Sequence, residues 1–176
     1  MLERIIIAGS GGQGIMLLGK VIAYAAVIDA RQVTWMPAYG PEVRGGSAHC
    51  SVIISDEEIG SPYIDKADTL VIMNGVAGEK FKNSIQPKGF LLLNSSFAQD
   101  PIYARIPHVV HHPFTDIAIS LGNIRVANIV ALGCLLARKR IVQVESVVEA
   151  MRRMASDKPE LFAINYTALM KGRELS

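Results

Sequence analysis

The chain has 176 residues, half of them apolar and 19% charged, and its formal net charge is +2 at pH 7. This length fits one domain, residues 1–176, with enough mass to bury a core. No apolar run reaches the ~18 residues that a membrane-spanning helix needs, and scattered basic residues with few aromatics argue against nucleic-acid binding. The N-terminus lacks the cleavage region of a signal peptide. The apolar excess instead predicts a subunit that buries surface against partner proteins.

The first predicted unit is a strand, a glycine turn and a helix. Residues 4–8 read Arg-Ile-Ile-Ile-Ala, which is typical of a strand buried on both faces. Gly9, Gly11 and Gly14 follow with the spacing G-x-G-x-x-G. Apolar residues then continue through 15–26 and predict a largely buried helix. This order is the first unit of an α/β fold.

The glycine turn has two interpretations. Glycine tolerates positive φ and lets backbone N–H groups approach another molecule, and the N-terminus of the following helix favours an anion. The turn is therefore either a cradle for a phosphate or carboxylate, or a tight connection whose glycines only permit close packing. The candidate binding residues are Gly9, Ser10, Gly11, Gly12, Gln13 and Gly14.

An ordinary NAD site is disfavoured. The dinucleotide fingerprint needs an acidic residue at the end of the second strand, roughly 20 residues on. The second strand is predicted over residues 32–36 and ends in Met36-Pro37. Asp29 lies near the right distance, but it precedes that strand.

The rest of the chain continues the α/β pattern. Two prolines and three glycines predict an ordered loop over residues 35–46. Further strands are predicted at residues 47–55, 69–73 and 89–94, with extended edge segments at 102–106 and 108–110. Helices are predicted at residues 79–85, 114–121, 125–137, 144–154 and 160–171. We expect a three-layer Rossmann-like α/β domain whose sheet is mostly parallel with an antiparallel edge.

Asn74 and Arg44, which both follow predicted strands, are two further candidate binding residues. Asn74 directly follows the strand at 69–73, where open α/β sheets place ligands. Arg44 stands before Gly45 and Gly46 in the loop, and its guanidinium suits phosphate or carboxylate. The alternative is a structural or interface ion pair, with Glu42 as a candidate partner.

No catalytic or metal-binding residue is predicted. In a strand, His111 faces away from His108 and His112, so the three do not converge on a metal. The two cysteines, Cys50 and Cys134, have no C-x-x-C spacing, which argues against an iron–sulfur cluster or zinc site in this chain. Their apolar surroundings predict buried thiols in a reducing cytoplasm.

Several motifs, taken in their order along the chain, resemble those of a known protein family. These are Gly-Ser-Gly-Gly-Gln-Gly at residues 9–14, Tyr-Gly-Pro-Glu-Val-Arg-Gly-Gly at 39–46, and Ile-Gly-Ser-Pro at 59–62 followed by Ala-Asp at 67–68. The chain resembles the gamma subunit of 2-oxoacid:ferredoxin oxidoreductases and the matching domain of single-chain pyruvate:ferredoxin oxidoreductases. Residues 123–133 and 165–172 extend the resemblance over nearly the whole chain. Trp-Met-Pro at 35–37 looks most like the 2-oxoglutarate branch.

The resemblance implies an enzyme complex that converts a 2-oxoacid, coenzyme A and oxidised ferredoxin to acyl-CoA, carbon dioxide and reduced ferredoxin. It places thiamine diphosphate and iron–sulfur clusters on partner subunits: alpha, beta and, in some complexes, delta. This chain would bind no cofactor alone, be inactive alone, and self-associate when isolated. The glycine loop, Tyr39, Arg44, Gly45, Gly46 and Asn74 would contact coenzyme A. Two alternatives remain open: a free-standing nucleotide- or phosphate-binding protein, and a purely structural subunit.

Overall fold

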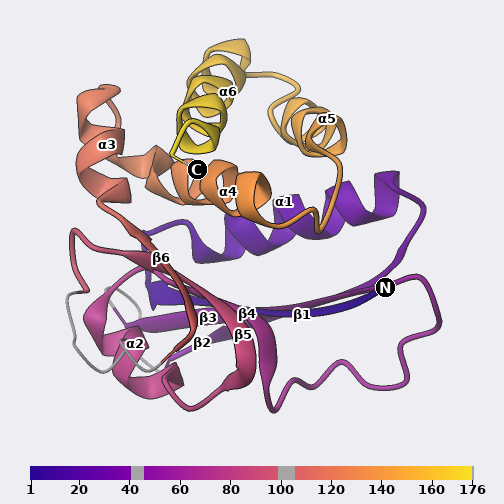
Figure 1. Cartoon of the computed structure of the whole chain (residues 1–176). Coiled ribbons are helices and arrows are strands. Elements are labelled where there is room, and N and C mark those ends of the chain that lie inside the picture. Colours follow the sequence, from indigo (N-terminus) through magenta and orange to yellow (C-terminus); the bar gives the residue numbers. More distant parts are fainter. Residues whose placement is uncertain (41–45, 99–105, 176) are drawn as a thin grey trace.

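The computed structural model describes residues 1–40, 46–98 and 106–175. In this part of the chain, one mixed sheet lies between helices (Figure 1). The strands are β1 (Leu2–Ser10), β2 (Gln32–Tyr39), β3 (Ser47–Ser55), β4 (Ala67–Ile72), β5 (Ile85–Asn94) and β6 (His108–His112). The helices are α1 (Ile15–Ile28), α2 (Gly75–Phe81), α3 (Phe114–Ser120), the 3₁₀ turn η2 (Ile124–Val126), α4 (Ala127–Arg138), α5 (Val144–Met154) and α6 (Pro159–Arg173).

The described strands lie in the order β2-β3-β1-β4-β5-β6. β1, β4, β5 and β6 are parallel neighbours, whereas β3 runs antiparallel to both β1 and β2. The hairpin-like pair β2–β3 therefore forms the antiparallel edge that the sequence predicts. The α/β class and the mostly parallel sheet are confirmed.

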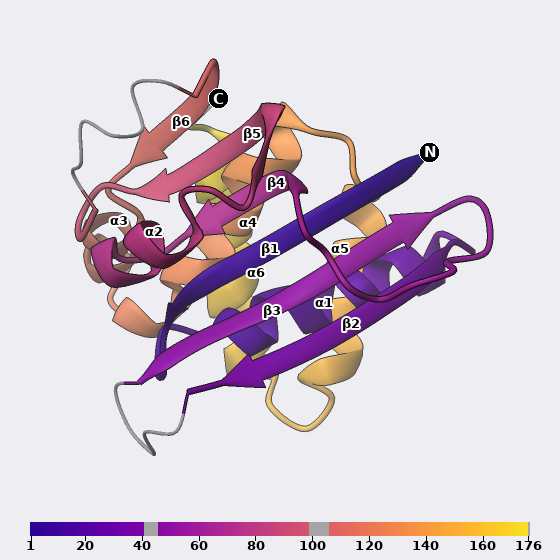
Figure 2. The same ribbon diagram turned by 90° about the horizontal axis from the view of Figure 1, so that it is seen from below.

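The helical layers on the two faces of the sheet are unequal. α1 and α4 cover one face, and α5 and α6 pack outside them (Figure 1). α2 is the only described helix on the opposite face, and Figure 2 shows β1, β2 and β3 with no helix in front of them. No helix among the described residues combines the length and apolar character needed to span a bilayer.

The apolar run of β1 is explained by burial on both faces. Ile5 and Ile7 join the core beneath α1 and α4, whereas Ile6 and Ala8 join the smaller core on the side of α2. Since successive strand residues point to opposite faces, a strand with a core on each side shows no polar alternation. The first strand is therefore confirmed as doubly buried.

Two sequence predictions of local structure are wrong. Residues 35–39 were expected in a loop, but β2 continues to Tyr39 through Pro37. β2 is an edge strand, where the missing N–H of a proline is tolerated. The helix expected at residues 79–85 instead runs from Gly75 to Phe81, because the Asn74 side chain caps it by accepting from the Ala77 N–H at 2.9 Å. Residue 85 already begins β5, which includes Pro87.

The cysteines are buried free thiols, as the sequence predicts. Burial raises the pKa of the Cys50 thiol to about 12. Its sulfur lies 3.5 Å from the Ile15 carbonyl oxygen, to which the thiol donates. Cys50 therefore stays protonated at neutral pH and packs as a small apolar side chain.

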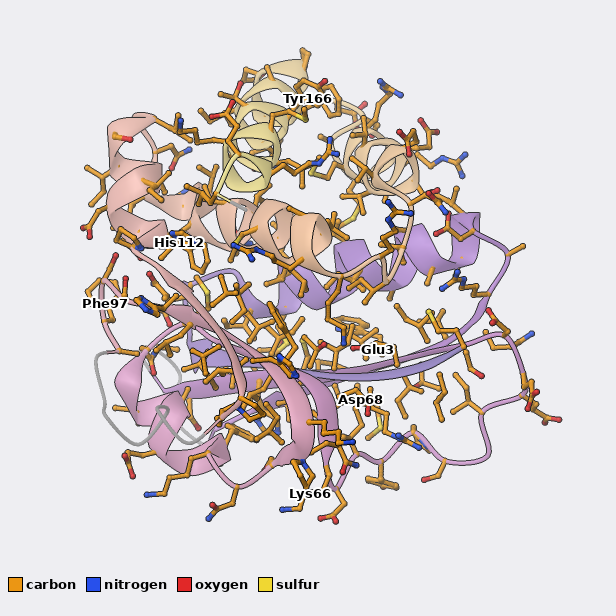
Figure 3. All side chains as sticks on the ribbon, viewed as in Figure 1. Glu3, Lys66, Asp68, Phe97, His112 and Tyr166 are labelled. Atoms are coloured by element: carbon orange, nitrogen blue, oxygen red, sulfur yellow. The ribbon has the colours of Figure 1, made fainter. Side chains whose placement is uncertain are left out.

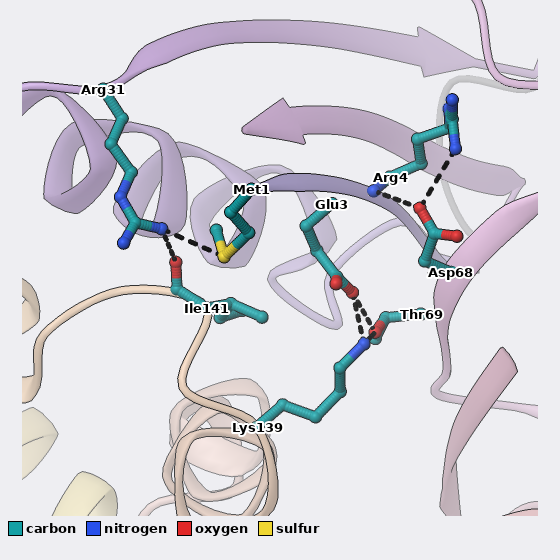
Figure 4. Close-up of polar contacts among 8 residues, drawn as sticks. All are labelled: Met1, Glu3, Arg4, Arg31, Asp68, Thr69, Lys139 and Ile141. Carbon is teal, nitrogen blue, oxygen red and sulfur yellow. Dashed lines mark hydrogen bonds and ion pairs between the residues drawn. The ribbon is translucent and has the colours of Figure 1, made fainter. Parts of the chain in front are cut away.

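A polar cluster ties the C-terminal end of α4 to the amino ends of β1 and β4 (Figure 4). The Lys139 ammonium lies 2.5 Å from Glu3 Oε1 and donates to Thr69 Oγ1 at 2.8 Å. The Thr69 hydroxyl also donates to Glu3 Oε1 at 2.5 Å. Glu3 and Thr69 are buried, so the carboxylate depends on these two donors for its stabilisation.

Candidate functional site

The candidate site lies where β1 and β4 end side by side. The chain leaves β1 toward α1 on one face of the sheet and leaves β4 toward α2 on the other (Figures 1 and 2). Such a reversal of direction opens a crevice at the carboxyl ends of the strands, and open α/β sheets bind ligands there. Residues 9–14 and Asn74 meet at this point.

The conformation of the loop favours glycine at two positions. Gly12 has φ +92° and Gly14 has φ +71°, a region that side chains other than glycine rarely adopt. A Cβ at Gly14 would also lie 2.3 Å from Asn128 Nδ2. Asn128 donates through that nitrogen to the Gly14 carbonyl oxygen at 3.0 Å, which links α4 to the loop.

The side chains of Gln13, Asn74 and Ser10 form hydrogen bonds that fix the loop against the end of β4. Gln13 Oε1 accepts from the Ser10 N–H at 2.8 Å and from Asn74 Nδ2 at 2.9 Å. Gln13 Nε2 donates to the Met73 carbonyl at 3.2 Å, and Asn74 Nδ2 also donates to Ser10 Oγ at 2.6 Å. These three predicted site residues are brought together, and their polar atoms hold the loop to the end of β4.

The second predicted motif reaches the loop at its last residue. The Gly11 N–H donates to the carbonyl oxygen of Gly46, which is buried, at 2.9 Å. Arg44 and Gly45 were also predicted as binding residues, and they lie outside the described residues, as does Glu42. The structure thus joins the two sequence motifs through their glycines.

A pocket of about 280 Å³ opens beside the loop. It is lined by residues of the glycine loop, by the first turn of α1 and by Tyr39, whose side chain is 72% exposed. Within the described part of the chain, no side chain caps α1, and its first turn holds no acidic residue. The first-turn N–H groups lack intrahelical partners, and free N–H groups at the start of a helix are suited to binding an anion.

A larger pocket, of about 490 Å³, lies at the other end of the sheet, around the start of β1. Its lining includes Glu57 and Glu58, and its cation Arg4 already contacts Asp68 at 3.4 Å. The amino ends of strands are not where open α/β sheets bind ligands. We therefore assign the candidate site to the smaller pocket beside the glycine loop.

Two histidines have lowered pKa values. Burial, and secondly the charge of Lys80, lowers the pKa of His49, whose ring lies 4.8 Å from that of Phe81. Burial is also the main cause that lowers the pKa of His112, which is labelled in Figure 3. Among the described residues, no group of three histidine, cysteine, aspartate or glutamate side chains is placed to hold a metal ion.

Asp29 takes a structural role. It follows the last turn of α1, and its carboxylate accepts from the backbone N–H of Gln143 at 2.8 Å and from the Ser146 hydroxyl. These bonds hold the start of α5 against the end of α1. Asp29 precedes the amino end of β2, at the opposite end of the sheet from the glycine loop, so it cannot hold a ribose bound at that loop.

Fold and loop together define an α/β domain of Rossmann type with a glycine-rich turn at its switch point. The family model described as pyruvate ferredoxin/flavodoxin oxidoreductase matches residues 4–175. The chain belongs to this family, and the family resemblance predicted from the sequence motifs is confirmed.

Three known proteins illustrate the relationship. The 2-oxoglutarate synthase subunit KorC of Methanocaldococcus jannaschii is 34% identical, over 100% of this chain and 95% of its own length. The ketoisovalerate oxidoreductase subunit VorA of Methanothermobacter thermautotrophicus is 36% identical over 97% of this chain and 36% of its own. A solved 2-oxoglutarate:ferredoxin oxidoreductase from Magnetococcus marinus, with 2-oxoglutarate, coenzyme A and succinyl-CoA bound, aligns with a TM-score of 0.88 and 28% identity, over 99% of this chain and 31% of that one. This chain therefore spans about a third of the length of VorA and of the Magnetococcus chain.

Two contributors to the site were missed by sequence reasoning. The Gly11–Gly46 bond and the Asn128–Gly14 bond join segments far apart in the chain. Asn128 lies in a strongly apolar helix, and an asparagine buried in such a helix is a signal that its amide has a specific partner.

Proposed function

We propose that this chain is the gamma subunit of a multi-subunit 2-oxoacid:ferredoxin oxidoreductase. The complex would cleave a 2-oxoacid, transfer the acyl group to coenzyme A, release carbon dioxide and pass two electrons to ferredoxin. The observation that carries this proposal is the braced glycine loop at the switch point, in a chain that matches KorC over nearly the full length of both. The complex would be cytoplasmic, where thiols such as Cys50 stay reduced.

The substrate is proposed to be 2-oxoglutarate. KorC relatives of about the same length as this chain support it, as does the likeness to the Magnetococcus enzyme. The VorA relative is named for ketoisovalerate, so this branched 2-oxoacid is the competing substrate.

The role proposed for the chain itself is to hold the phosphates of coenzyme A. The N–H groups at the start of α1 and the loop backbone around Gly12 would act as donors. Tyr39, exposed at the pocket, offers an aromatic surface for an adenine base. Gln13 and Asn74 would act indirectly, by keeping the loop in position. Arg44, with Gly45 and Gly46, would add a cation, as the sequence motif predicts.

The other parts of the reaction are assigned to partners. Alpha and beta subunits, with a delta subunit in some complexes, would carry the iron–sulfur clusters and thiamine diphosphate, which stabilises the carbanion left by decarboxylation. The described residues of this chain hold no metal-binding cluster. We therefore expect the isolated chain to be inactive.

The proposal is tested by assembling the complex with and without this chain. We expect the alpha and beta subunits to reduce ferredoxin with 2-oxoglutarate and coenzyme A only after the purified chain is added, and faster than with ketoisovalerate or pyruvate. Ferredoxin reduction is followed by absorbance and acyl-CoA by chromatography. Failure of the chain to associate with these subunits would contradict the proposal. Faster turnover of ketoisovalerate would reassign the substrate alone.

A further inference from the structure

A third pocket, of about 130 Å³, lies on the other side of the glycine loop from the candidate site. Gly12, Gln13 and Met73 form one wall, and Phe97, Ile124 and Arg125 are among the residues that form the rest. Phe97 lies in the turn after β5, and Ile124 and Arg125 form the start of η2. Figure 3 shows Phe97 at the end of the molecule where α2 and α3 lie.

Three of the side chains that line this pocket are exposed, two of them apolar and one cationic. Phe97 and Ile124 are each 55% exposed. Arg125 is exposed as well, and no carboxylate in the described part of the chain forms an ion pair with its guanidinium. Asp116, next to the pocket residue Thr115, is instead bonded to the Ser96 hydroxyl at 2.9 Å. We call Phe97, Ile124 and Arg125 the Arg125 surface.

The size of the pocket indicates what it can accept. Small-molecule and cofactor pockets are typically about 300–1,000 Å³. The candidate site's pocket, of about 280 Å³, is close to that range, whereas 130 Å³ is less than half of it and too small for a substantial part of coenzyme A. It is suited to one apolar side chain. Anchor side chains that fill small pockets, ringed by exposed apolar residues and an arginine, are typical of protein–protein interfaces.

The relatives supply an independent reason to expect a protein here. VorA and the Magnetococcus chain carry this domain together with about twice as much further chain. If the proposed function holds, separate subunits replace that further chain in this protein. Some surface of this domain must then contact a partner polypeptide.

We propose that the Arg125 surface docks a segment of a partner subunit that presents an apolar side chain next to a carboxylate. The apolar side chain fills the pocket between Phe97 and Ile124, and the carboxylate pairs with the Arg125 guanidinium. This inference rests on the proposed function. It places the partner beside Gly12 and Gln13, so that docking also covers one side of the glycine loop.

The test measures how tightly the purified chain binds the complex that lacks it. Arg125→Glu is compared with Arg140→Glu, which makes the same change of charge at an exposed arginine beyond the other end of α4, a helix of 12 residues that spans about 18 Å. Arginine anchors at interfaces are typically worth a factor of about 30 or more in Kd. We expect Arg125→Glu to weaken binding at least about 30-fold and Arg140→Glu to leave it unchanged.

Phe97→Ser provides a second variant that leaves the charge intact, and we expect it to weaken binding also. Because Phe97 and Arg125 are exposed, both variants should unfold at the wild-type temperature by circular dichroism. Raising the salt concentration should weaken wild-type binding more than that of Arg125→Glu, since the variant lacks the ion pair.

Three results would overturn the inference while leaving the proposed function intact. The first is wild-type affinity of Arg125→Glu for a complex that binds the wild-type chain. The second is normal assembly of Arg125→Glu with a raised Michaelis constant for coenzyme A, which would assign the pocket to a small anion. The third is an equal loss of affinity in Arg140→Glu. If the wild-type chain itself does not bind, both the inference and the proposed function fail.

Discussion

Replacing Gly172 with alanine is expected to destabilise the protein by about 3 kcal/mol, which is the upper part of the range for overpacking. A Cβ at Gly172 would lie 2.0 Å from the Val130 carbonyl oxygen, and one at Gly133 would lie 2.1 Å from the Leu169 carbonyl oxygen. Both obstacles are backbone atoms of the facing helix, so α4 and α6 would have to move apart. For a chain of this size, the melting temperature should fall by roughly 6–12 °C.

Helix propensity alone predicts the opposite sign for the change in stability on Gly172→Ala, so the measured sign distinguishes the two effects. Alanine in a helix is favoured over glycine by about 1 kcal/mol, so an uncrowded site would be stabilised. Gly60→Ala is the control, because a Cβ there meets nothing within 4 Å, and it should change stability by less than about 0.5 kcal/mol. A Gly172→Ala variant as stable as the wild type would contradict the close crossing of α4 and α6.

Replacing Lys139 with alanine is expected to cost about 3 kcal/mol of unfolding free energy. The Glu3 side chain is only 10% exposed, and Lys139 is its charged partner at 2.5 Å. Removing one member of a buried ion pair leaves the other charge without compensation, and such losses are typically about 3–5 kcal/mol. We expect a loss of unfolding free energy at the low end of this range because the Lys139 side chain is 25% exposed and therefore partly solvated. Unfolding in urea provides the measurement.

The control for Lys139 is Lys171→Ala. Lys171 lies 2.8 Å from Glu174, but both side chains are largely exposed, and such pairs contribute about 0–1 kcal/mol. The double variant Glu3→Gln with Lys139→Met removes both charges and should recover much of the lost stability. Equal effects of Lys139→Ala and Lys171→Ala would show that the Glu3 carboxylate is not dependent on Lys139.

Strongly patterned elements were predictable from the sequence alone. The strand Ser47–Ser55 and the helix Val144–Met154 begin and end where their residue patterns indicate. The predictions failed where tertiary context decided the structure. Pro37 lies in a strand because that strand is at the sheet edge, and the helix after Asn74 begins early because the asparagine caps it.

The sequence predicts those features of the candidate site that depend on neighbouring residues, but not the contacts between segments far apart in the chain. The glycine loop and Asn74 both follow buried strands, and parallel strand ends meet at one edge of the sheet. The bond from Gly11 to Gly46 and the position of Arg125 depend on how distant segments pack, which residue spacing does not reveal. Arg44 and Gly45 lie outside the described residues, so their part in the site remains a prediction from the motif.

The proposed binding of coenzyme A at the glycine loop can be measured through the Michaelis constant for coenzyme A in the assembled complex. Gly12 and Gly122 make a matched pair, because both have positive φ, +92° and +88°, and a Cβ at either meets open space. Asparagine and aspartate tolerate this conformation better than other side chains. The variants are Gly12→Asp, Gly12→Asn and, as the control, Gly122→Asn.

We expect Gly12→Asp to raise that Michaelis constant by about one to two orders of magnitude. The substitution places a carboxylate at the proposed phosphate site, where it opposes a charge-assisted contact worth roughly 1.5–3 kcal/mol. Gly12→Asn should raise it less, and Gly122→Asn should leave it unchanged. Arg44→Ala should act like Gly12→Asp if the motif prediction holds. Release of carbon dioxide in the absence of coenzyme A should survive in every variant. An unchanged dependence on coenzyme A in an intact Gly12→Asp complex would contradict the claim and leave the loop a purely structural connection.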